Sequence, residues 1–223
     1  MYTLRKLFLI SLPAVLVFAQ TAGAPATNLG IFTNSADVGD PVKKGAAEFD
    51  ATNGQYRITG SGANIWDKQD QFQYVWKEMT GNFMVTATMQ FLGQLAQSEE
   101  HRKAGIMLRQ SLDADSPYGD IVIHGSGMPG LQWRANKGEI TNTFDMPFDS
   151  PGKYKLMLVR SGVGLTVSLA KDGAALKKMV RTEVTFRGPI LVGLAVCAHN
   201  ANNSETVVFS DVTIDPTVPP GSH

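Results

Sequence analysis

Apolar and polar residues alternate along three short runs in the middle of the chain, residues 103–110, 118–125 and 131–136. Successive side chains of a β-strand point to opposite faces, so each run is predicted to be a strand with one apolar and one polar face. The apolar face would carry Ile106, Leu108, Ile121, Ile123, Leu131 and Trp133, and the opposite face Met107, Arg109, Asp120, His124, Gln132 and Arg134. The pattern therefore predicts a sheet with a core side and a polar side.

Further alternating runs occupy most of the remaining chain. Residues 46–50 and 55–59 are predicted to form a hairpin around Asn53-Gly54, because Asn-Gly favours tight hairpin turns. Phe72, Tyr74 and Trp76 share one face of the run 71–77, and we expect them in the core. Additional strands are predicted at 82–92, 153–160, 164–170, 178–186, 190–199 and 206–214. Many short strands without a long helix indicate an all-β sandwich or barrel.

The two ends of the chain differ from this pattern. Arg5 and Lys6 precede an apolar run, residues 7–18, which is too short to span a bilayer. With the small residues that follow, it predicts a secretory signal peptide over 1–19, with cleavage possible as late as residue 24. We expect one domain over 28–215 and a disordered tail over 216–223. The mature protein would be secreted or periplasmic, with no attachment to a membrane.

Charge and cysteine content narrow the function classes. The 223 residues contain 20 Lys and Arg and 20 Asp and Glu, so the formal net charge is zero. A neutral chain has no general attraction for nucleic acid or anionic membranes, and we expect neither as a partner. Cys197 is the single cysteine, so an internal disulfide is excluded. Its apolar surroundings favour a packed residue over a nucleophile.

Four segments resemble a known family. They are G-S-G-A-N-I-W (60–66), K-A-G-I-M-L-R-Q-S-L (103–112), L-Q-W-R (131–134) and G-L-A-V-C-A-H-N (193–200). In this order they are similar to a domain of unknown function found in bacterial secreted proteins and in a fungal enolase-regulating protein. The resemblance covers roughly 37–215 and implies a concanavalin A-like jelly-roll sandwich of two antiparallel sheets. Cys197-Ala198 stands where members usually carry Thr-Ser.

The resemblance also implies that polysaccharide would bind on the concave face of one sheet. The predicted ligand-binding residues are Arg109, Asp120, His124, Gln132, Arg134, His199 and Trp66. Arg, Gln, Asp and His offer planar donors and acceptors that suit vicinal hydroxyls. Two arginines and a histidine on adjacent strands need a balancing acid, which Asp120 or an anionic sugar could supply. An ordinary solvated face with ion pairs from Asp120 to Arg109 or Arg134 is the alternative.

Trp66 follows a glycine-rich loop and admits two interpretations. Its ring could stack on a sugar or recognise a cation, or it could plug one end of the sandwich.

Catalytic and metal sites have less support. Glycoside hydrolysis needs two carboxylates flanking the substrate, and no strand carries the E-x-D-x-x-E pattern of sandwich-fold glucanases. The histidines show no metal-ligand spacing. Calcium is possible near the termini, because Asp37, Asp40, Glu48 and Asp211 offer oxygen ligands.

Three functions remain open from the sequence. The first is a secreted, non-catalytic module that binds carbohydrate on its concave face. The second is an enzyme acting on a glycoside or keto-sugar, with Asp120 and His124 as acid and base. The third is a protein-interaction domain that associates through exposed sheet edges.

Overall fold

The computed structural model describes residues 28–93, 99–147 and 150–217. All regular elements in these ranges are strands, and they form three sheets. The strands are β1 (Asn34–Val38), β2 (Ala46–Asp50), β3 (Gln55–Gly60), β4 (Ile65–Trp66), β5 (Gln69–Asp70), β6 (Phe72–Met79), β7 (Phe83–Phe91), β8 (Lys103–Arg109), β9 (Tyr118–His124), β10 (Pro129–Arg134), β11 (Asn142–Asp145), β12 (Tyr154–Ser161), β13 (Gly164–Lys171), β14 (Lys177–Glu183), β15 (Ile190–Cys197) and β16 (Glu205–Asp215).

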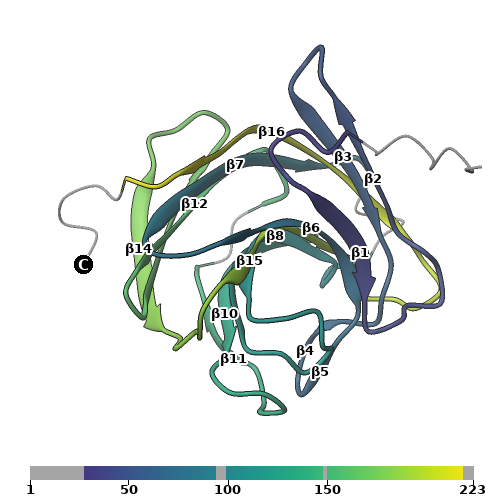
Figure 1. Ribbon diagram of the computed structural model, residues 1–223. Coiled ribbons are helices and arrows are strands. Elements are labelled where there is room, and N and C mark those ends of the chain that lie inside the picture. Colours follow the sequence, from purple (N-terminus) through teal and green to yellow (C-terminus); the bar gives the residue numbers. More distant parts are fainter. Residues whose placement is uncertain (1–27, 94–98, 148–149, 218–223) are drawn as a thin grey trace, which may run out of the picture.

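Two seven-stranded antiparallel sheets form the body of the molecule. The first has the order β1-β6-β15-β8-β9-β10-β11, and the second β14-β13-β12-β7-β16-β3-β2. The two sheets lie as nested arcs, and a third, two-stranded sheet, β4-β5, lies on the concave side of the first (Figure 1). The predicted sandwich of two antiparallel sheets is confirmed.

The hydrophobic core lies between the two large sheets. It contains the predicted core residues of the central strands, Ile106, Leu108, Ile121, Ile123 and Leu131, and Trp133 packs against it partly buried. Burial of such side chains contributes about 1.5 to 3 kcal/mol each, which fixes the register of these strands. Their alternate residues must therefore face the concave side of the first sheet.

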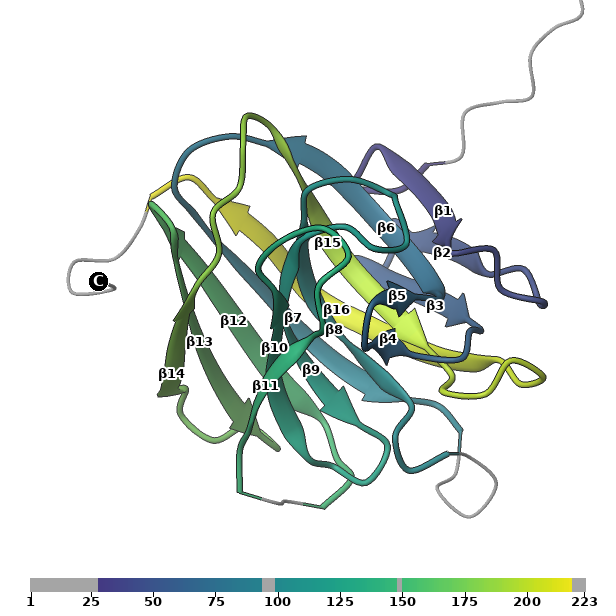
Figure 2. The same ribbon diagram turned by 90° about the horizontal axis from the view of Figure 1, so that it is seen from below.

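The burial predicted for Phe72, Tyr74 and Trp76 is confirmed, and the structure shows where on the sheet it occurs. All three are buried, but they belong to a second apolar cluster, apart from the inter-sheet core. This cluster also contains Ile65 of β4, Met107 of β8 and Tyr118 of β9. Because β4-β5 crosses the concave side of the first sheet (Figure 2), an aromatic side chain can be buried there without entering the sandwich. Period-two patterns show which side chains share a face, but they do not show what covers that face.

Two glycines of the first sheet lie where neighbouring strands approach closely. A Cβ atom on Gly105 of β8 would lie 1.9 Å from the carbonyl oxygen of Ile121, and one on Gly193 of β15 would lie 1.9 Å from that of Val75. Both positions therefore require glycine, as is usual where strands bend or backbones approach closely.

The predicted signal peptide lies outside the described residues, as does most of the predicted tail. No helix in the described ranges is long and apolar enough to cross a membrane.

Candidate functional site

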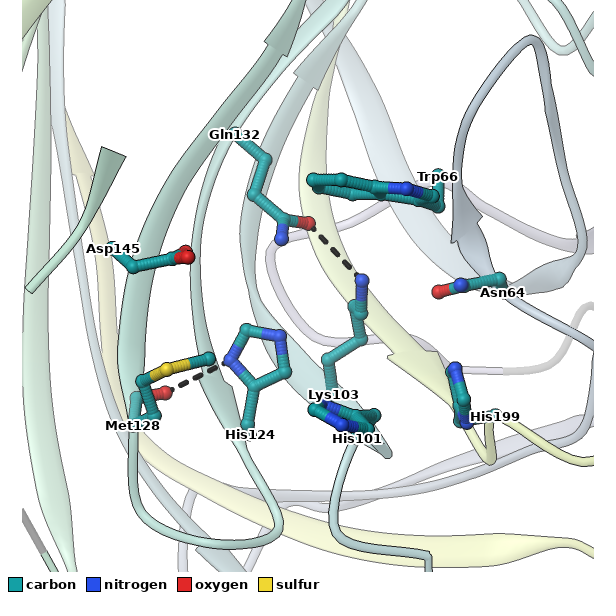
Figure 3. A pocket seen from close by; sticks show the side chains of 9 residues that line it. All are labelled: Asn64, Trp66, His101, Lys103, His124, Met128, Gln132, Asp145 and His199. Atoms are coloured by element: carbon teal, nitrogen blue, oxygen red, sulfur yellow. Dashed lines mark hydrogen bonds between the residues drawn. The ribbon is translucent and has the colours of Figure 1, made fainter. Parts of the chain in front are cut away.

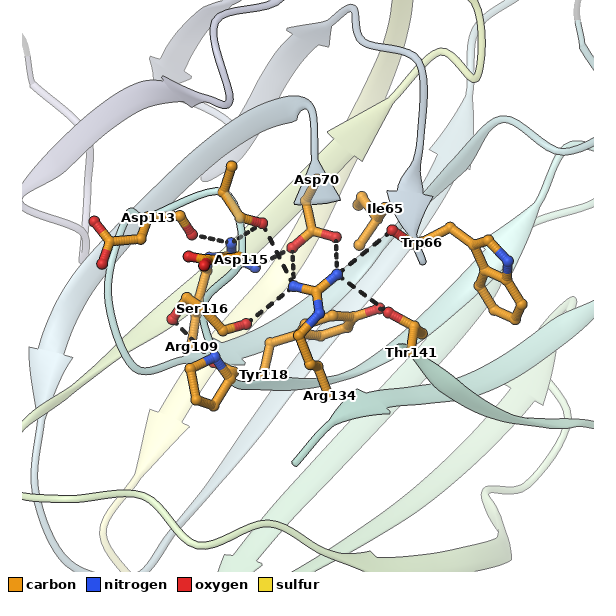
Figure 4. Close-up of polar contacts among 12 residues, drawn as sticks. Ile65, Trp66, Asp70, Arg109, Asp113, Asp115, Ser116, Tyr118, Arg134 and Thr141 are labelled. Atoms are coloured by element: carbon orange, nitrogen blue, oxygen red, sulfur yellow. Dashed lines mark hydrogen bonds and ion pairs between the residues drawn. The ribbon is translucent and has the colours of Figure 1, made fainter. Parts of the chain in front are cut away.

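The strand register places the polar residues of β8, β9 and β10 in rows across the concave face. Arg109 is opposite Tyr118, which is opposite Arg134; Met107, Asp120 and Gln132 form the next row. Gly105, Val122 and Gly130 follow, and then Lys103 opposite His124. Gly130 of the third row has no side chain to fill the space beside His124 and Asp145. The open half of the face is drawn in Figure 3 and the closed half in Figure 4.

The open half is a pocket of about 270 Å³. Its lining comes from six parts of the chain that are brought together by the sheet and by the β4-β5 hairpin. The lining residues are Asn64, Trp66, His101, Lys103, His124, Met128, Gln132, Asp145 and His199. In Figure 3 the Trp66 ring lies along one side, above the Lys103 amine, while Asp145 and His199 lie at opposite ends. The pocket is therefore walled by an aromatic ring and lined mainly by planar polar groups.

The closed half is held by a buried ion-pair network centred on Asp70 of β5 (Figure 4). Asp70 accepts hydrogen bonds from Arg109 Nη1 at 2.7 Å and from Arg134 Nη1 and Nη2 at 2.7 and 2.8 Å. All three side chains have zero exposed surface. We call these residues the Asp70 triad. Buried charges are tolerated only when they are paired and hydrogen-bonded, and this network meets both conditions.

The two guanidinium groups also hold three loops. Arg109 donates to the carbonyls of Ser111 and Ala114 in the β8–β9 loop. Arg134 donates to the carbonyls of Glu139, after β10, and of Trp66, in the hairpin. The triad therefore ties the β4-β5 hairpin and the two neighbouring loops to the concave face. Since the Trp66 carbonyl is one of the acceptors, this network positions the aromatic wall of the pocket.

Lys103 lies at the boundary between the two halves. Only 2% of its surface is exposed, and its amine donates to the Ile65 carbonyl at 3.0 Å and to Gln132 Oε1 at 3.3 Å. It forms no ion pair with any carboxylate in the described part of the chain. Burial lowers the pKa of Lys103, although Cys197 and Asp120 act in the opposite direction. The amine retains one N–H for a further acceptor.

Two histidines of the pocket, His124 and His199, are held neutral. Burial, together with the charge of Lys103, lowers the pKa of His124 to about 4. Its Nδ1 lies 2.9 Å from the carbonyl of Met128, so Nδ1 carries the proton and Nε2 is left as an acceptor. Burial also lowers the pKa of His199, with Lys103 and His101 contributing in the same direction. At neutral pH the pocket thus offers imidazoles that can accept or donate hydrogen bonds.

Asp120 lies beneath the pocket and does not line it. It is fully buried, and neither carboxylate oxygen accepts a hydrogen bond of good geometry from the described residues. Burial raises the pKa of Asp120 well above its usual value, while Lys103 and the backbone N–H of Gln132 act against that shift. Asp120 is therefore an internal group that a ligand in the pocket does not touch.

The predicted site residues fall into two groups. His124, Gln132, His199 and Trp66 meet in the pocket. Arg109, Arg134 and Asp120 do not offer groups to a ligand, because all three are fully buried and both arginines are saturated by Asp70 and backbone carbonyls. The alternative of ion pairs from Asp120 to Arg109 or Arg134 is wrong, because both arginines pair with Asp70, which no local pattern in the sequence singled out.

Sequence reasoning missed five lining residues: Asn64, His101, Lys103, Met128 and Asp145. Lys103 could have been predicted, because it lies on the same face of its strand as Met107 and Arg109. Asn64 stands two residues before Trp66 within the same glycine-rich segment. Asp145 enters through the pairing of β11 with β10, which no local pattern specified.

A metal centre is not formed by the described residues. No group of three or more His, Cys, Asp or Glu side chains lies close enough within them to hold an ion. The oxygen donors considered for calcium are thus not gathered; the Asp37 carboxylate instead accepts a hydrogen bond from the backbone N–H of Gly45 at 3.0 Å.

Comparisons with known proteins identify solved structures with a similar fold. No protein-family model matches the chain, and no curated sequence matches it. A functionally unknown protein from Saccharomyces cerevisiae is 16% identical with a TM-score of 0.62, over 84% of this chain and 97% of that one. The carbohydrate-binding module CBM66 from Bacillus subtilis is 14% identical with a TM-score of 0.52, over 83% and 97% of the two chains. Lectin II from Ulex europaeus is 11% identical with a TM-score of 0.51, over 82% and 98%. These likenesses confirm the concanavalin A-like jelly-roll fold.

Replacing Asp70 should test the triad. Asp70→Asn leaves two buried guanidinium groups with one neutral partner, so we expect the free energy of unfolding to fall by about 3 to 5 kcal/mol in urea titrations. Asp113→Asn is the matched control, because its ion pair with Lys137 lies on the surface and such pairs contribute little. Equal stability of the two variants would contradict the role assigned to the triad.

Acid should destabilise the fold through His124. The unfolded chain binds a proton near pH 6.5, whereas folded His124 does so only at about 4, so stability is lost as pH falls between these values. The contribution amounts to about 3 kcal/mol between pH 7 and 4. Urea unfolding of wild type and His124→Asn across this range measures it. A pH slope that is identical in both proteins would show that His124 is not the group responsible.

Proposed function

We propose that the chain is a secreted, non-catalytic carbohydrate-binding module that holds a sugar ring in the concave pocket. The observation that carries the proposal is the meeting of an indole wall with the planar polar side chains of Asn64, Gln132, His124 and His199 around one hollow. An aromatic ring packs against the apolar face of a sugar, while amides and imidazoles bond its hydroxyls. A volume of about 270 Å³ is small beside drug-sized pockets, which suits a single ring.

The wider comparisons support this class of ligand. Similar folds occur in a protein named as a carbohydrate-binding module and in a plant lectin. The four motifs of the resembled family supply the hairpin, β8, β10 and the end of β15, and these segments carry Asn64, Trp66, Lys103, Gln132 and His199. We propose membership of that family, and export directed by residues 1–19, on these grounds and on the N-terminal sequence pattern.

Hydrolysis is the alternative function on the same face. A retaining or inverting glycosidase needs two carboxyl groups on either side of the scissile bond. Asp145 is the one carboxylate among the described residues that line the pocket, and Asp120, the acid considered from sequence, is sealed beneath it. The lining therefore favours binding over turnover.

Removing the aromatic wall should abolish most of the affinity. We expect Trp66→Ala to weaken binding of a glycan identified on an array by roughly tenfold or more, since buried aromatic contacts dominate such sites. The backbone carbonyl that bonds Arg134 remains, so the hairpin should keep its place. Phe144→Ala, an exposed aromatic of β11 outside the lining, is the control. Calorimetry on the full chain measures both, and equal affinities would place the site elsewhere.

A panel of polysaccharides should show binding without cleavage. We expect no new reducing ends after prolonged incubation with the full chain, because the lining lacks the second carboxylate. Release of reducing sugar that disappears in Asp145→Ala would contradict the non-catalytic assignment and favour the hydrolase.

A further inference from the structure

The pocket gathers more groups that can carry a positive charge than a neutral sugar requires. Its lining includes every histidine of the described ranges: His101, His124 and His199. The His101 ring centroid lies 6.0 Å from that of His124 and 5.3 Å from that of His199. With Lys103 they form a set of four potential cations, which we call the basic cluster. Asp145 is the carboxylate that faces them in the lining.

Positive groups also outnumber carboxyl groups among the buried residues behind the pocket. Beneath the concave face lie three fully or nearly fully buried cations, Arg109, Arg134 and Lys103, against two carboxyl groups, Asp70 and Asp120. Asp70 is engaged by both arginines. Lys103 bonds only neutral oxygens and forms no ion pair within the described residues, although its amine lines the pocket. Burying an ammonium group without a hydrogen-bonded anion costs free energy, and an anionic ligand beside Lys103 would offset that cost.

We propose that the pocket binds an acidic sugar, a residue of the uronic acid class, and that its carboxylate lies in the basic cluster. The inference rests on the proposed carbohydrate-binding function and specifies its ligand. In Figure 3 Lys103, His101 and His199 lie toward one end of the pocket and Asp145 toward the other. The sugar carboxylate would therefore take the Lys103 end, and the ring hydroxyls would donate to Asp145 and bond Gln132.

Binding of such an anion is linked to proton uptake. His124 and His199 are kept neutral by burial, by Lys103 and by His101. A bound carboxylate opposes the repulsion among these groups and raises the pKa of the imidazoles near it. The complex then holds more protons than the free protein, so affinity rises as pH falls below 7. A sugar carboxyl remains ionised over this range, because carboxyl groups titrate near pH 4.

Other charged groups around the cluster limit this effect without reversing it. From β11, Asp145 raises the pKa of His124, and from the loop before β8, Glu99 raises that of His199. Glu99 also accepts a hydrogen bond from Asn200 at 3.0 Å, beside His199. Asp120 lies beneath the pocket. In both histidines burial and the neighbouring cations outweigh these carboxylates, since both pKa values are lowered.

The test compares each acidic ligand with its uncharged methyl ester. Oligomers of galacturonic, glucuronic and mannuronic acid are each paired with the same oligomer after methyl esterification, which removes the charge and keeps the ring. Calorimetry on the full chain at pH 6 should give at least one pair in which the acid binds roughly tenfold tighter than the ester, as loss of one charge-assisted contact predicts. For that acid, affinity should rise severalfold from pH 7.5 to 5.5, and titrations in two buffers of different ionisation enthalpy should show net proton uptake.

Variants locate the effect in the basic cluster. Lys103→Met should abolish the preference, so that this variant binds the acid and its ester with equal affinity, and Lys155→Met, on an exposed position of β12 in the other sheet, should keep the wild-type preference. His124→Asn should reduce the measured proton uptake. A Lys103→Met protein that still prefers the acid would overturn the assignment of its carboxylate to this end of the pocket.

The possible results separate this inference from the proposed function. Equal affinity for every acid and its ester, or binding of neutral glycans alone, overturns the acidic ligand and leaves carbohydrate binding intact. Preference for the acid without pH dependence overturns the proton linkage. Absence of binding to any glycan, acidic or neutral, overturns the proposed function itself.

Discussion

The buried ion pairs between Asp70 and two arginines are the constraint on which the arrangement of the site depends. A concave sheet face left open would expose Tyr74, Tyr118 and Met107 to water. The β4-β5 hairpin covers them, yet two strands of two residues each cannot hold their place by their own ladder. Asp70 gives the hairpin an anchor with three charge-assisted hydrogen bonds, which are stronger than neutral ones. Fixing the hairpin also fixes Trp66, so stability and site geometry share one cause.

The same network divides the concave face into unlike halves. On the hairpin side the apolar cluster and the triad leave no exposed surface on the central side chains. On the other side, Gly130 leaves room where a side chain would stand. The three atoms nearest to a Cβ on Gly130 would all be side-chain atoms of the pocket, from Asp145 and His124 at 3.5 Å and from Gln132 at 3.8 Å, so this position leaves space and does not constrain the backbone. Gly105 has the opposite character, because the neighbouring strand occupies its Cβ position. One row across the sheet thus holds a glycine required by a close approach between strands and a glycine that leaves space in the pocket.

Local patterns predicted the sandwich well and the site only in part. Period-two alternation was enough to place Ile106, Ile121 and Leu131 between the sheets, because burial on one face determines register. The partner of Arg109 and Arg134 could not be predicted, because Asp70 comes from a hairpin some forty residues before Arg109 and joins it only in three dimensions. For the same reason Arg109, Asp120 and Arg134 were expected on an accessible, ligand-binding face, whereas they are buried. Polar residues at alternate positions of a strand identify the face that points away from the inter-sheet core. They do not show whether that face is exposed to solvent or covered by another part of the chain.

That distinction changes what the polar residues mean. A buried arginine whose donors all bond a carboxylate and carbonyls stabilises the fold. A buried lysine that bonds only neutral oxygens has a charge that no anion compensates. Lys103 is of the second kind, since it is buried under the hairpin and also lines the pocket. The sheet register places it opposite His124, so its field lowers the pKa of that imidazole. A ligand anion that reaches Lys103 would therefore act on the histidines through the same field. The Lys103 amine therefore connects the buried polar groups with the ionisation of the pocket. We expect the charge of this amine to determine which ligands the site selects, more than the shape of the cavity does.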